Sequence, residues 1–231
     1  MCTACHSVGS CLAAIGDFDG PSDDPCQPLG TAKPRPIARL SVCEPWHTLL
    51  GRDDEPGLPM PDDGDGASLL VFGRGGTQKT TMLLELAAHV AKMRDCNAVW
   101  VPTEPNQTRD MLMGIAKRIG FDASALRFTT ASSLAGICEQ LQARPRTLVV
   151  VDSLSVFDAP VVAWHAIRRA CSGAAFAGVV HVNKDGRMAG AEKLRHLCDT
   201  VVRTSRSSVA ISGKNRFGPV RSVRKPEKYR G

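Results

Sequence analysis

Short apolar runs alternate with amphipathic stretches along the chain after residue 66. The apolar runs predict buried strands at residues 68–72, 98–101, 126–129, 147–151, 177–182, 200–203 and 209–212. The stretches between them carry apolar residues at helical spacing, which predicts helices over 80–93, 108–119, 134–143 and 164–171. Strands that alternate with helices predict an α/β fold, a mainly parallel twisted sheet with helices on both faces. Ligands of such sheets bind at the carboxyl ends of the strands.

The pattern divides the chain into three parts. Residues 1–36 contain clusters of Gly, Pro, Ser and Asp without a sustained apolar period, so we expect an acidic, poorly ordered segment. Residues 37–66 are interpreted as a linker with a stretch that docks on the body, and residues 67–231 as the core with a basic C-terminal stretch. No internal repeat is present.

The N-terminal and C-terminal parts of the chain also differ in net charge. The net charge of the 231-residue chain is +6, yet residues 1–66 hold four basic and eleven acidic side chains. Residues 203–231 hold nine basic side chains and one acidic side chain, Glu227. A basic body of this kind attracts a polyanion such as nucleic acid, although a soluble protein can also carry a basic surface without such a partner.

Composition narrows the class of protein. No run approaches 18 uninterrupted apolar residues, so we expect no membrane span. The N-terminus lacks a basic flank before an apolar run, so we expect no secretory signal. The nine cysteines are then interpreted as reduced thiols or metal ligands of a cytoplasmic protein.

A glycine-rich loop between the first strand and the first helix predicts a nucleotide site. The candidate nucleotide-binding residues are Gly73, Arg74, Gly75, Gly76, Thr77, Gln78, Lys79, Thr80 and Thr81, together with Asp152. In a Walker A loop, Lys79 would reach the β- and γ-phosphates of ATP and Thr80 would hold Mg²⁺. Gln78 stands where the motif has its second glycine, and its Cβ is expected to impair hydrolysis more than binding. The alternative is a glycine-rich turn without a ligand.

Two carboxylates follow predicted strands. Asp152 ends a buried strand, the Walker B position, from which it would hold the Mg²⁺ shell with Thr80. Glu104 follows the strand after the first helix and is the candidate catalytic base that orients the attacking water. The alternatives are a helix cap or turn residue for Asp152 and a solvated loop acid for Glu104.

Three segments together resemble the bacterial DNA-repair RadA (Sms) family. Residues 214–218 read KNRFG, the signature of that family, and residues 181–186 read HVNKDG, similar to its HVTK segment. The phosphate loop and Asp152-Ser153, in the family's Walker B position, complete the resemblance. It implies a RecA-like P-loop ATPase core that uses ATP and Mg²⁺, forms a homo-oligomeric ring or filament on single-stranded DNA and promotes branch migration.

The resemblance also assigns roles to individual residues. It implies that Lys214 and Arg216 act as catalytic charge-stabilising fingers near the nucleotide of a neighbouring subunit. Glu104 falls where the family carries its catalytic glutamate. The second DNA loop would retain Lys184 and Arg187 as DNA-binding residues. From the residues alone, a Lys-x-Arg pair in a basic loop is equally a phosphate contact to DNA or a turn without a ligand.

The chain departs from the family in three ways. The family's Lon-protease-like C-terminal domain is expected to be absent, because 13 residues follow Gly218. The span between the Walker B aspartate and the HVNK segment is shorter, which puts DNA threading in doubt. The family's paired C-x-x-C zinc finger is reduced to the cysteines Cys2, Cys5, Cys11 and Cys26. These four are interpreted as a degenerate zinc site or as a cysteine-bearing tail without metal.

Two functional hypotheses follow. The first is a RadA-like, DNA-dependent ATPase of recombination and repair. The second is a degenerate nucleotide-binding module that hydrolyses little or no ATP and assembles on DNA or on a protein. Gln78 and the shortened DNA-loop region favour the second, whereas Lys79, Glu104 and Asp152 serve the first.

Overall fold

A computed structural model of the chain describes residues 39–51, 57–60, 66–141, 146–183, 188 and 193–230. They all belong to one compact unit, residues 36–231. The candidate zinc ligands Cys2, Cys5, Cys11 and Cys26 and the candidate DNA-binding residues Lys184 and Arg187 lie outside the described residues. Within the described ranges, no helix is both long enough and apolar enough to cross a bilayer.

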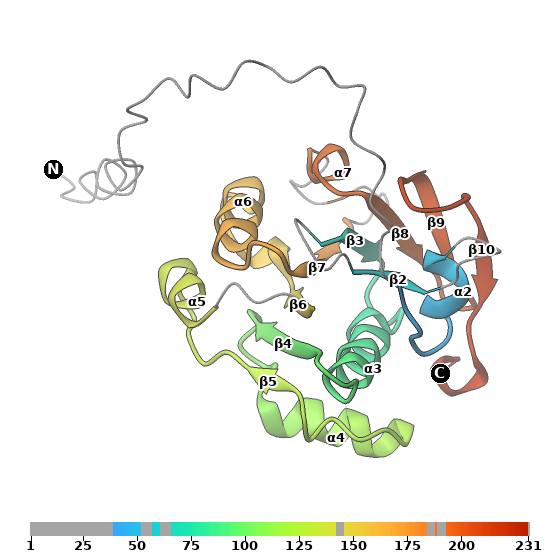
Figure 1. The fold of residues 1–231 in the computed structure, drawn as a ribbon, viewed down its shortest axis with the longest axis horizontal. Coiled ribbons are helices and arrows are strands. Elements are labelled where there is room, and N and C mark those ends of the chain that lie inside the picture. The colour runs from blue at the N-terminus through green and yellow to red at the C-terminus, as the bar shows by residue number, and fades with distance from the viewer. Residues whose placement is uncertain are drawn as a thin grey trace, which may run out of the picture. The chain divides into compact units, whose positions relative to one another are not determined.

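An eight-stranded sheet forms the centre of the unit (Figure 1). Its order is β10-β9-β8-β3-β7-β6-β4-β5. The strands are β3 (Ser68–Gly73), β4 (Asn97–Pro102), β5 (Arg127–Phe128), β6 (Thr147–Asp152), β7 (Ala175–His181), β8 (Thr200–Thr204), β9 (Ser208–Asn215) and β10 (Ser222–Arg224). The strands from β8 to β5 pair in parallel, while β9 and β10 extend the sheet antiparallel. The predicted fold class, a mainly parallel α/β sheet, is confirmed.

Helices cover both faces of the sheet, as Figure 1 shows. The helices α3 (Lys79–Ala91) and α4 (Arg109–Ile119) lie on one face, and α5 (Leu134–Gln140), α6 (Pro160–Ala170) and α7 (Leu194–Leu197) lie on the other. Alternate residues of one strand enter the two cores: Leu69 and Val71 of β3 pack with α3, and Leu70 and Phe72 pack on the α6 side. Burial on both faces explains why these strands are uninterrupted apolar runs.

Short elements before and after the sheet pack on the α3 face. Residues 39–60 contribute β1 (Arg39–Leu40), α2 (Trp46–Leu50) and β2 (Leu58–Pro59), with β1 and β2 paired antiparallel. Trp46 is fully buried, and its indole Nε1–H donates to the Met82 carbonyl of α3 at 3.0 Å. The part of the chain that the structure describes also contains the 3-10 turns η1 (Leu154–Val156) and η2 (Glu227–Tyr229).

The helix boundaries follow local chemistry. Thr108, predicted as the first residue of this helix, instead caps α4 through its side chain, and Gly120 ends the helix in the left-handed conformation. Helix α6 begins at Pro160, four residues before the predicted start at Trp164, because proline is preorganised for the first helical position.

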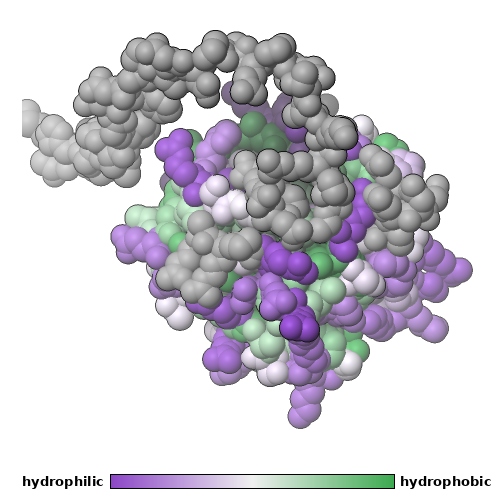
Figure 2. All heavy atoms as spheres, viewed as in Figure 1, coloured by the Kyte–Doolittle hydropathy of each residue, from purple (hydrophilic) through white to green (hydrophobic). Residues whose placement is uncertain are grey.

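Polar side chains dominate the surface visible in Figure 2, and apolar residues show between them. Among the described residues, the large apolar side chains that are exposed are Val156, Val162, Leu197 and Val220.

Candidate nucleotide-binding site

The phosphate loop lies between the end of β3 at Gly73 and the start of α3 at Lys79, at the carboxyl edge of the parallel strands. Gly73 passes so close to β8 that a Cβ there would lie 2.2 Å from Thr204 Oγ1 and 2.5 Å from the Thr204 carbonyl oxygen. Only glycine fits this approach. The phosphate loop therefore begins in close contact with β8 and ends at the N-terminus of α3. The N-terminus of a helix binds anions favourably.

Gln78 occupies the position of the missing glycine in a left-handed conformation, with φ 59° and ψ 26°. A residue with a Cβ is strained there by roughly 1–2 kcal/mol. Thr81 offsets part of that strain, because its Oγ1 donates to Gln78 Oε1 at 2.8 Å. The chain thus keeps the backbone path that glycine takes, and Thr81 supports Gln78 from the first turn of α3.

Replacing Gln78 with glycine is expected to leave the melting temperature nearly unchanged, because relief of the left-handed strain is offset by the lost Thr81 contact and a more flexible unfolded chain. Replacing it with valine is expected to destabilise the protein by about 2 kcal/mol, since a β-branched residue is a genuine outlier at positive φ. Thermal unfolding of the two variants measures the difference. Equal stability of the two would contradict the left-handed assignment.

Lys79 is nearly buried, with 5% of its surface exposed. Its Nζ donates to the carbonyls of Gly73 and Arg74, both at 3.0 Å. Burial lowers the pKa of Lys79, while the negative charges of Asp152 and Glu104 act in the opposite direction. The ammonium group is held at the rim of the loop, inside a water-poor setting where its attraction to a phosphate is strong.

Asp152 lies beside the first turn of α3. Its Oδ2 accepts from Thr80 Oγ1 at 2.5 Å and from Gln107 Nε2 at 2.9 Å, and the residue is 1% exposed. Burial raises the pKa of Asp152, and the two hydrogen bonds oppose that rise. A buried carboxylate beside a hydroxyl makes a hard oxygen donor set, which suits Mg²⁺.

Two further polar atoms support that fit. Gln107 Oε1 and Ser153 Oγ are buried without a hydrogen-bond partner among the described residues. Mg²⁺ keeps several of its water molecules when it binds, and such waters satisfy unpaired acceptors and hydroxyls. Gln107 was not singled out from the sequence, because nothing in its local pattern distinguishes it from other loop amides.

Glu104 contacts a histidine from a different strand. Glu104 Oε1 lies 2.6 Å from His181 Nε2, and the two side chains are 26% and 42% exposed respectively. His181 ends β7, which lies between the strand of the phosphate loop and the strand of Asp152. Thr103 ties the Glu104 loop to β6, because its backbone N–H donates to the Asp152 carbonyl and its Oγ1 to the Ser153 carbonyl. Glu104, His181 and Asp152 are therefore gathered at one edge of the sheet.

A buried lysine near the C-terminal end donates a hydrogen bond to the backbone of the phosphate loop. Lys225 is 0% exposed, and its Nζ donates to the Thr77 carbonyl at 2.5 Å. Burial, followed by the nearby Lys79 charge, lowers the pKa of Lys225 to about 8. Lys228 and Tyr229 attach the C-terminal stretch to α3, because the Lys228 ammonium and the Tyr229 hydroxyl both donate to the Glu85 carboxylate. The sequence predicted a basic stretch here, either polyanion-binding or simply a basic surface, and did not single out Lys225.

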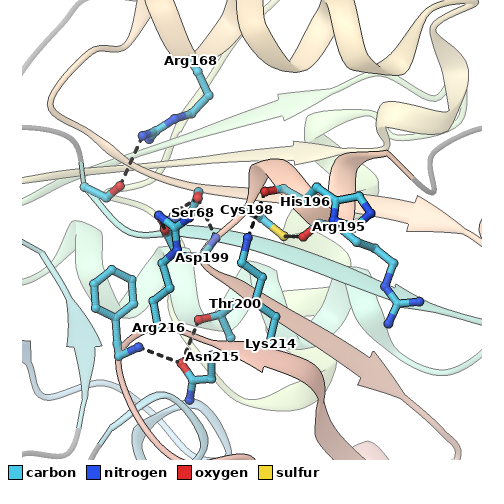
Figure 3. Close-up of polar contacts among 12 residues, drawn as sticks. Ser68, Arg168, Arg195, His196, Cys198, Asp199, Thr200, Lys214, Asn215 and Arg216 are labelled. Atoms are coloured by element: carbon cyan, nitrogen blue, oxygen red, sulfur yellow. Dashed lines mark hydrogen bonds and ion pairs between the residues drawn. The ribbon is translucent and has the colours of Figure 1, made fainter.

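Lys214 and Arg216 lie near Asp199 and His196 (Figure 3). Arg216 Nη1 pairs with Asp199 Oδ1 at 3.1 Å, and Asp199 Oδ2 accepts from the backbone N–H and hydroxyl of Ser68. Ser68 starts β3, whereas the phosphate loop follows the end of that strand. Six residues of strand span roughly 17 Å, so Arg216 lies at the opposite end of β3 from the phosphate loop of the same chain.

The KNRFG turn is built around its asparagine. Asn215 Oδ1 accepts from Thr200 Oγ1 and from the Phe217 backbone N–H, and Asn215 Nδ2 donates to the Pro219 carbonyl. Lys214 Nζ donates to the His196 carbonyl at the end of α7. Gly218 passes so close to Gly51 that a Cβ would lie 2.6 Å from the Gly51 carbonyl oxygen. These contacts hold the backbone of the turn, and with it the positions from which the Lys214 and Arg216 side chains extend.

Among the described residues, no group of three or more His, Cys, Asp or Glu side chains forms a metal site. The candidate zinc ligands are not among those residues. Zinc binding by Cys2, Cys5, Cys11 and Cys26 therefore stays a prediction, as does DNA binding by Lys184 and Arg187.

Comparison with known proteins supports the resemblance seen in the sequence. No family model matches the chain. The chain is similar to the DNA repair protein RadA of Haemophilus influenzae, at 28% identity over 177 residues, which are 68% of this chain and 38% of that protein. It is 28% identical over 178 residues to RadA of Treponema pallidum (67% of the chain, 36% of that protein) and 28% identical over 177 residues to RadA of Escherichia coli (68% and 38%). The chain thus spans less than two fifths of the length of these curated relatives.

Proposed function

We propose that the chain is a RadA-like, DNA-dependent ATPase that acts in DNA recombination and repair. The observation that carries the proposal is the convergence of Lys79, Thr80, Asp152 and Glu104 at one edge of the sheet. Similarity to DNA repair proteins named RadA supports the biological setting. ATP, Mg²⁺ and single-stranded DNA are the proposed ligands.

Each residue of the site has a chemical task in this proposal. Lys79 binds the phosphates that lie against the N-terminus of α3. Thr80 and Asp152 hold Mg²⁺, which offsets charge on the phosphates. Glu104 orients a water molecule and takes its proton as that water attacks.

His181 positions the base. Its 2.6 Å contact fixes one oxygen of the Glu104 carboxylate and leaves the second oxygen for the water. His181 lies just before the segment that resembles the family's DNA loop. DNA binding at that segment would therefore shift the His181 side chain, and with it the orientation of the Glu104 carboxylate.

A homo-oligomer, a ring or a filament, is part of the proposal. Lys214 and Arg216 lie at the end of β3 away from the phosphate loop of the same chain. Arg216 is 65% exposed despite its pairing with Asp199, so its guanidinium can reach the nucleotide of a neighbouring subunit. Transition-state charge stabilised across an interface makes hydrolysis depend on assembly.

The proposal is tested by steady-state ATP turnover with and without single-stranded DNA. The parent protein is expected to turn over ATP faster with DNA. Glu104→Gln removes the base while keeping the shape of the side chain, and is expected to lower turnover by about 100-fold or more while nucleotide binding persists. Glu139→Gln, an exposed acid on α5, is the matched control and is expected to behave like the parent. Undiminished turnover in Glu104→Gln would overturn the assignment of the base.

Gln78 favours a second candidate function, a nucleotide-binding module with little or no hydrolysis. Its side chain occupies a loop position where the motif has none. Tight, Lys79-dependent ATP binding without turnover, with or without DNA, would favour the module over the ATPase.

A further inference from the structure

A basic cavity of about 850 Å³ lies beside the phosphate loop, on the side away from Asp152. Its walls come from the phosphate loop, the end of β8, the β8–β9 turn and α7, at the end of the sheet where Figure 1 shows β8 and β9. Four arginines from these separate elements line it: Arg74, Arg195, Arg203 and Arg206. We refer to it as the arginine pocket.

Three of the four arginines of the arginine pocket have no partner among the described residues. No carboxylate belongs to the part of its lining that the structure describes. Arg74, Arg203 and Arg206 are exposed, and within the described ranges none of the three forms an ion pair or a side-chain hydrogen bond. Like charges gathered in one cavity repel one another, and a concave site of one sign concentrates ligands of the opposite sign.

The chemistry of the lining identifies the class of ligand. Guanidinium groups match phosphates through paired N–H donors. Ser205 and Ser212 add hydroxyl groups that serve phosphate oxygens equally. Four arginines from separate elements exceed what one phosphate can engage, so a chain of phosphates fits better than a single ion. Among the described lining residues none is Asn, Gln, Asp or Glu, the side chains that read adenine and cytosine edges, so we expect contacts to the phosphate backbone rather than to particular bases.

We propose that the arginine pocket binds consecutive phosphates of single-stranded nucleic acid and passes that binding on to the phosphate loop. This proposal rests on the proposed function in its second part, because coupling needs a nucleotide at the loop. The binding residues differ from Lys184 and Arg187, which the resemblance to the RadA family suggested.

Two sets of hydrogen bonds join the arginine pocket to the phosphate loop. The Arg74 side chain lines the pocket, and the Arg74 carbonyl accepts hydrogen bonds from Lys79 Nζ at 3.0 Å and Thr77 Oγ1 at 2.8 Å. Thr77 Oγ1 also bonds Thr204 Oγ1 at 2.8 Å, and Thr204 lies next to Arg203. A phosphate that binds the Arg74 and Arg203 side chains is therefore expected to shift the backbone of Arg74 and the side chain of Thr77. The Arg74 carbonyl in turn holds Lys79 Nζ.

The binding part is tested by fluorescence anisotropy of a labelled oligo-dT over a range of salt concentrations, without ATP. The double variant Arg203→Gln/Arg206→Gln is expected to bind at least 10-fold more weakly. Its slope of log K against log salt is expected to fall by about 1.4, since each phosphate contact on a single strand contributes about 0.7. The charge-matched control is Arg118→Gln/Arg127→Gln, two exposed arginines on α4 and β5, and it is expected to keep the parent slope.

The coupling part is tested by the affinity for a fluorescent ATP analogue with and without oligo-dT. DNA is expected to tighten nucleotide binding in the parent, and the ratio of the two affinities is expected to approach one in Arg74→Gln. A ratio in Arg74→Gln equal to that of the parent would overturn the coupling.

The outcomes separate this proposal from the proposed function. DNA binding that depends on Arg203 and Arg206, in a protein without ATP turnover, upholds the pocket and refutes the ATPase. DNA-stimulated turnover that Arg203→Gln/Arg206→Gln leaves intact, with parental affinity for the oligonucleotide, refutes the pocket and upholds the ATPase. Binding of inorganic tripolyphosphate as tightly as oligo-dT, with the same dependence on the two arginines, would overturn the assignment to nucleic acid.

Discussion

Replacing Lys79 with methionine is expected to weaken ATP binding by about 100-fold or more, because it removes a charge-assisted contact to the phosphates from a water-poor site. The effect is large because 5% of the lysine surface is exposed, so bulk water screens little of the attraction. Titration of the protein with a fluorescent ATP analogue in the presence of Mg²⁺ measures the change.

Stability provides the control for this variant. Burial disfavours the Lys79 charge in the folded state, as its lowered pKa indicates, and methionine fills a similar volume without a charge. Lys79→Met is therefore expected to unfold at the parent's melting temperature or slightly above it, so a loss of binding does not arise from unfolding. Parental affinity for ATP in a folded Lys79→Met protein would mean that the loop is a turn without a nucleotide.

The local chemistry of the sequence predicted the elements that carry the site. The loop, Asp152 and Glu104 each follow an apolar run that ends at a turn, and the structure places all three at one edge of the sheet. Such residues are predictable because parallel strands bring their carboxyl ends together whatever the details of packing.

The partners of these residues were not predictable in the same way. His181 meets Glu104 across 77 positions of sequence, and Lys225 reaches Thr77 across 148. Each pairing depends on strand order and on the path of a later segment, and one sequence alone does not specify either. Burial of Lys225 was the least expected, since lysine is almost never fully buried without a partner.

Short elements were missed for a related reason. The helices α2 and α7 have five and four residues, too few for a helical period to emerge. The strands β1, β2 and β10 have two or three residues, too few for a period of two to emerge, and each is defined by its pairing with another strand. Tertiary contacts rather than local preference decide such elements.

The second large effect is expected at Trp46, which fastens α2 to α3, the helix that follows the phosphate loop. Trp46→Ala removes a fully buried indole and leaves a cavity, at a cost of about 3–5 kcal/mol. For a unit of this size the melting temperature is expected to fall by roughly 10 °C. Thermal unfolding followed by far-UV circular dichroism measures the shift.

Trp46→Phe separates packing from the hydrogen bond. Phenylalanine keeps most of the apolar contact but cannot donate to the Met82 carbonyl, so this variant is expected to lose about 1–2 kcal/mol. Met82 lies in the first turn of α3, four residues after Gln78 at the end of the phosphate loop. Loss of the Trp46 contact is therefore expected to make this turn less rigid. Trp46→Ala is then expected to bind ATP more weakly, even at a temperature where the protein is still folded. A stable Trp46→Ala protein with parental ATP affinity would mean that α2 does not support the phosphate loop.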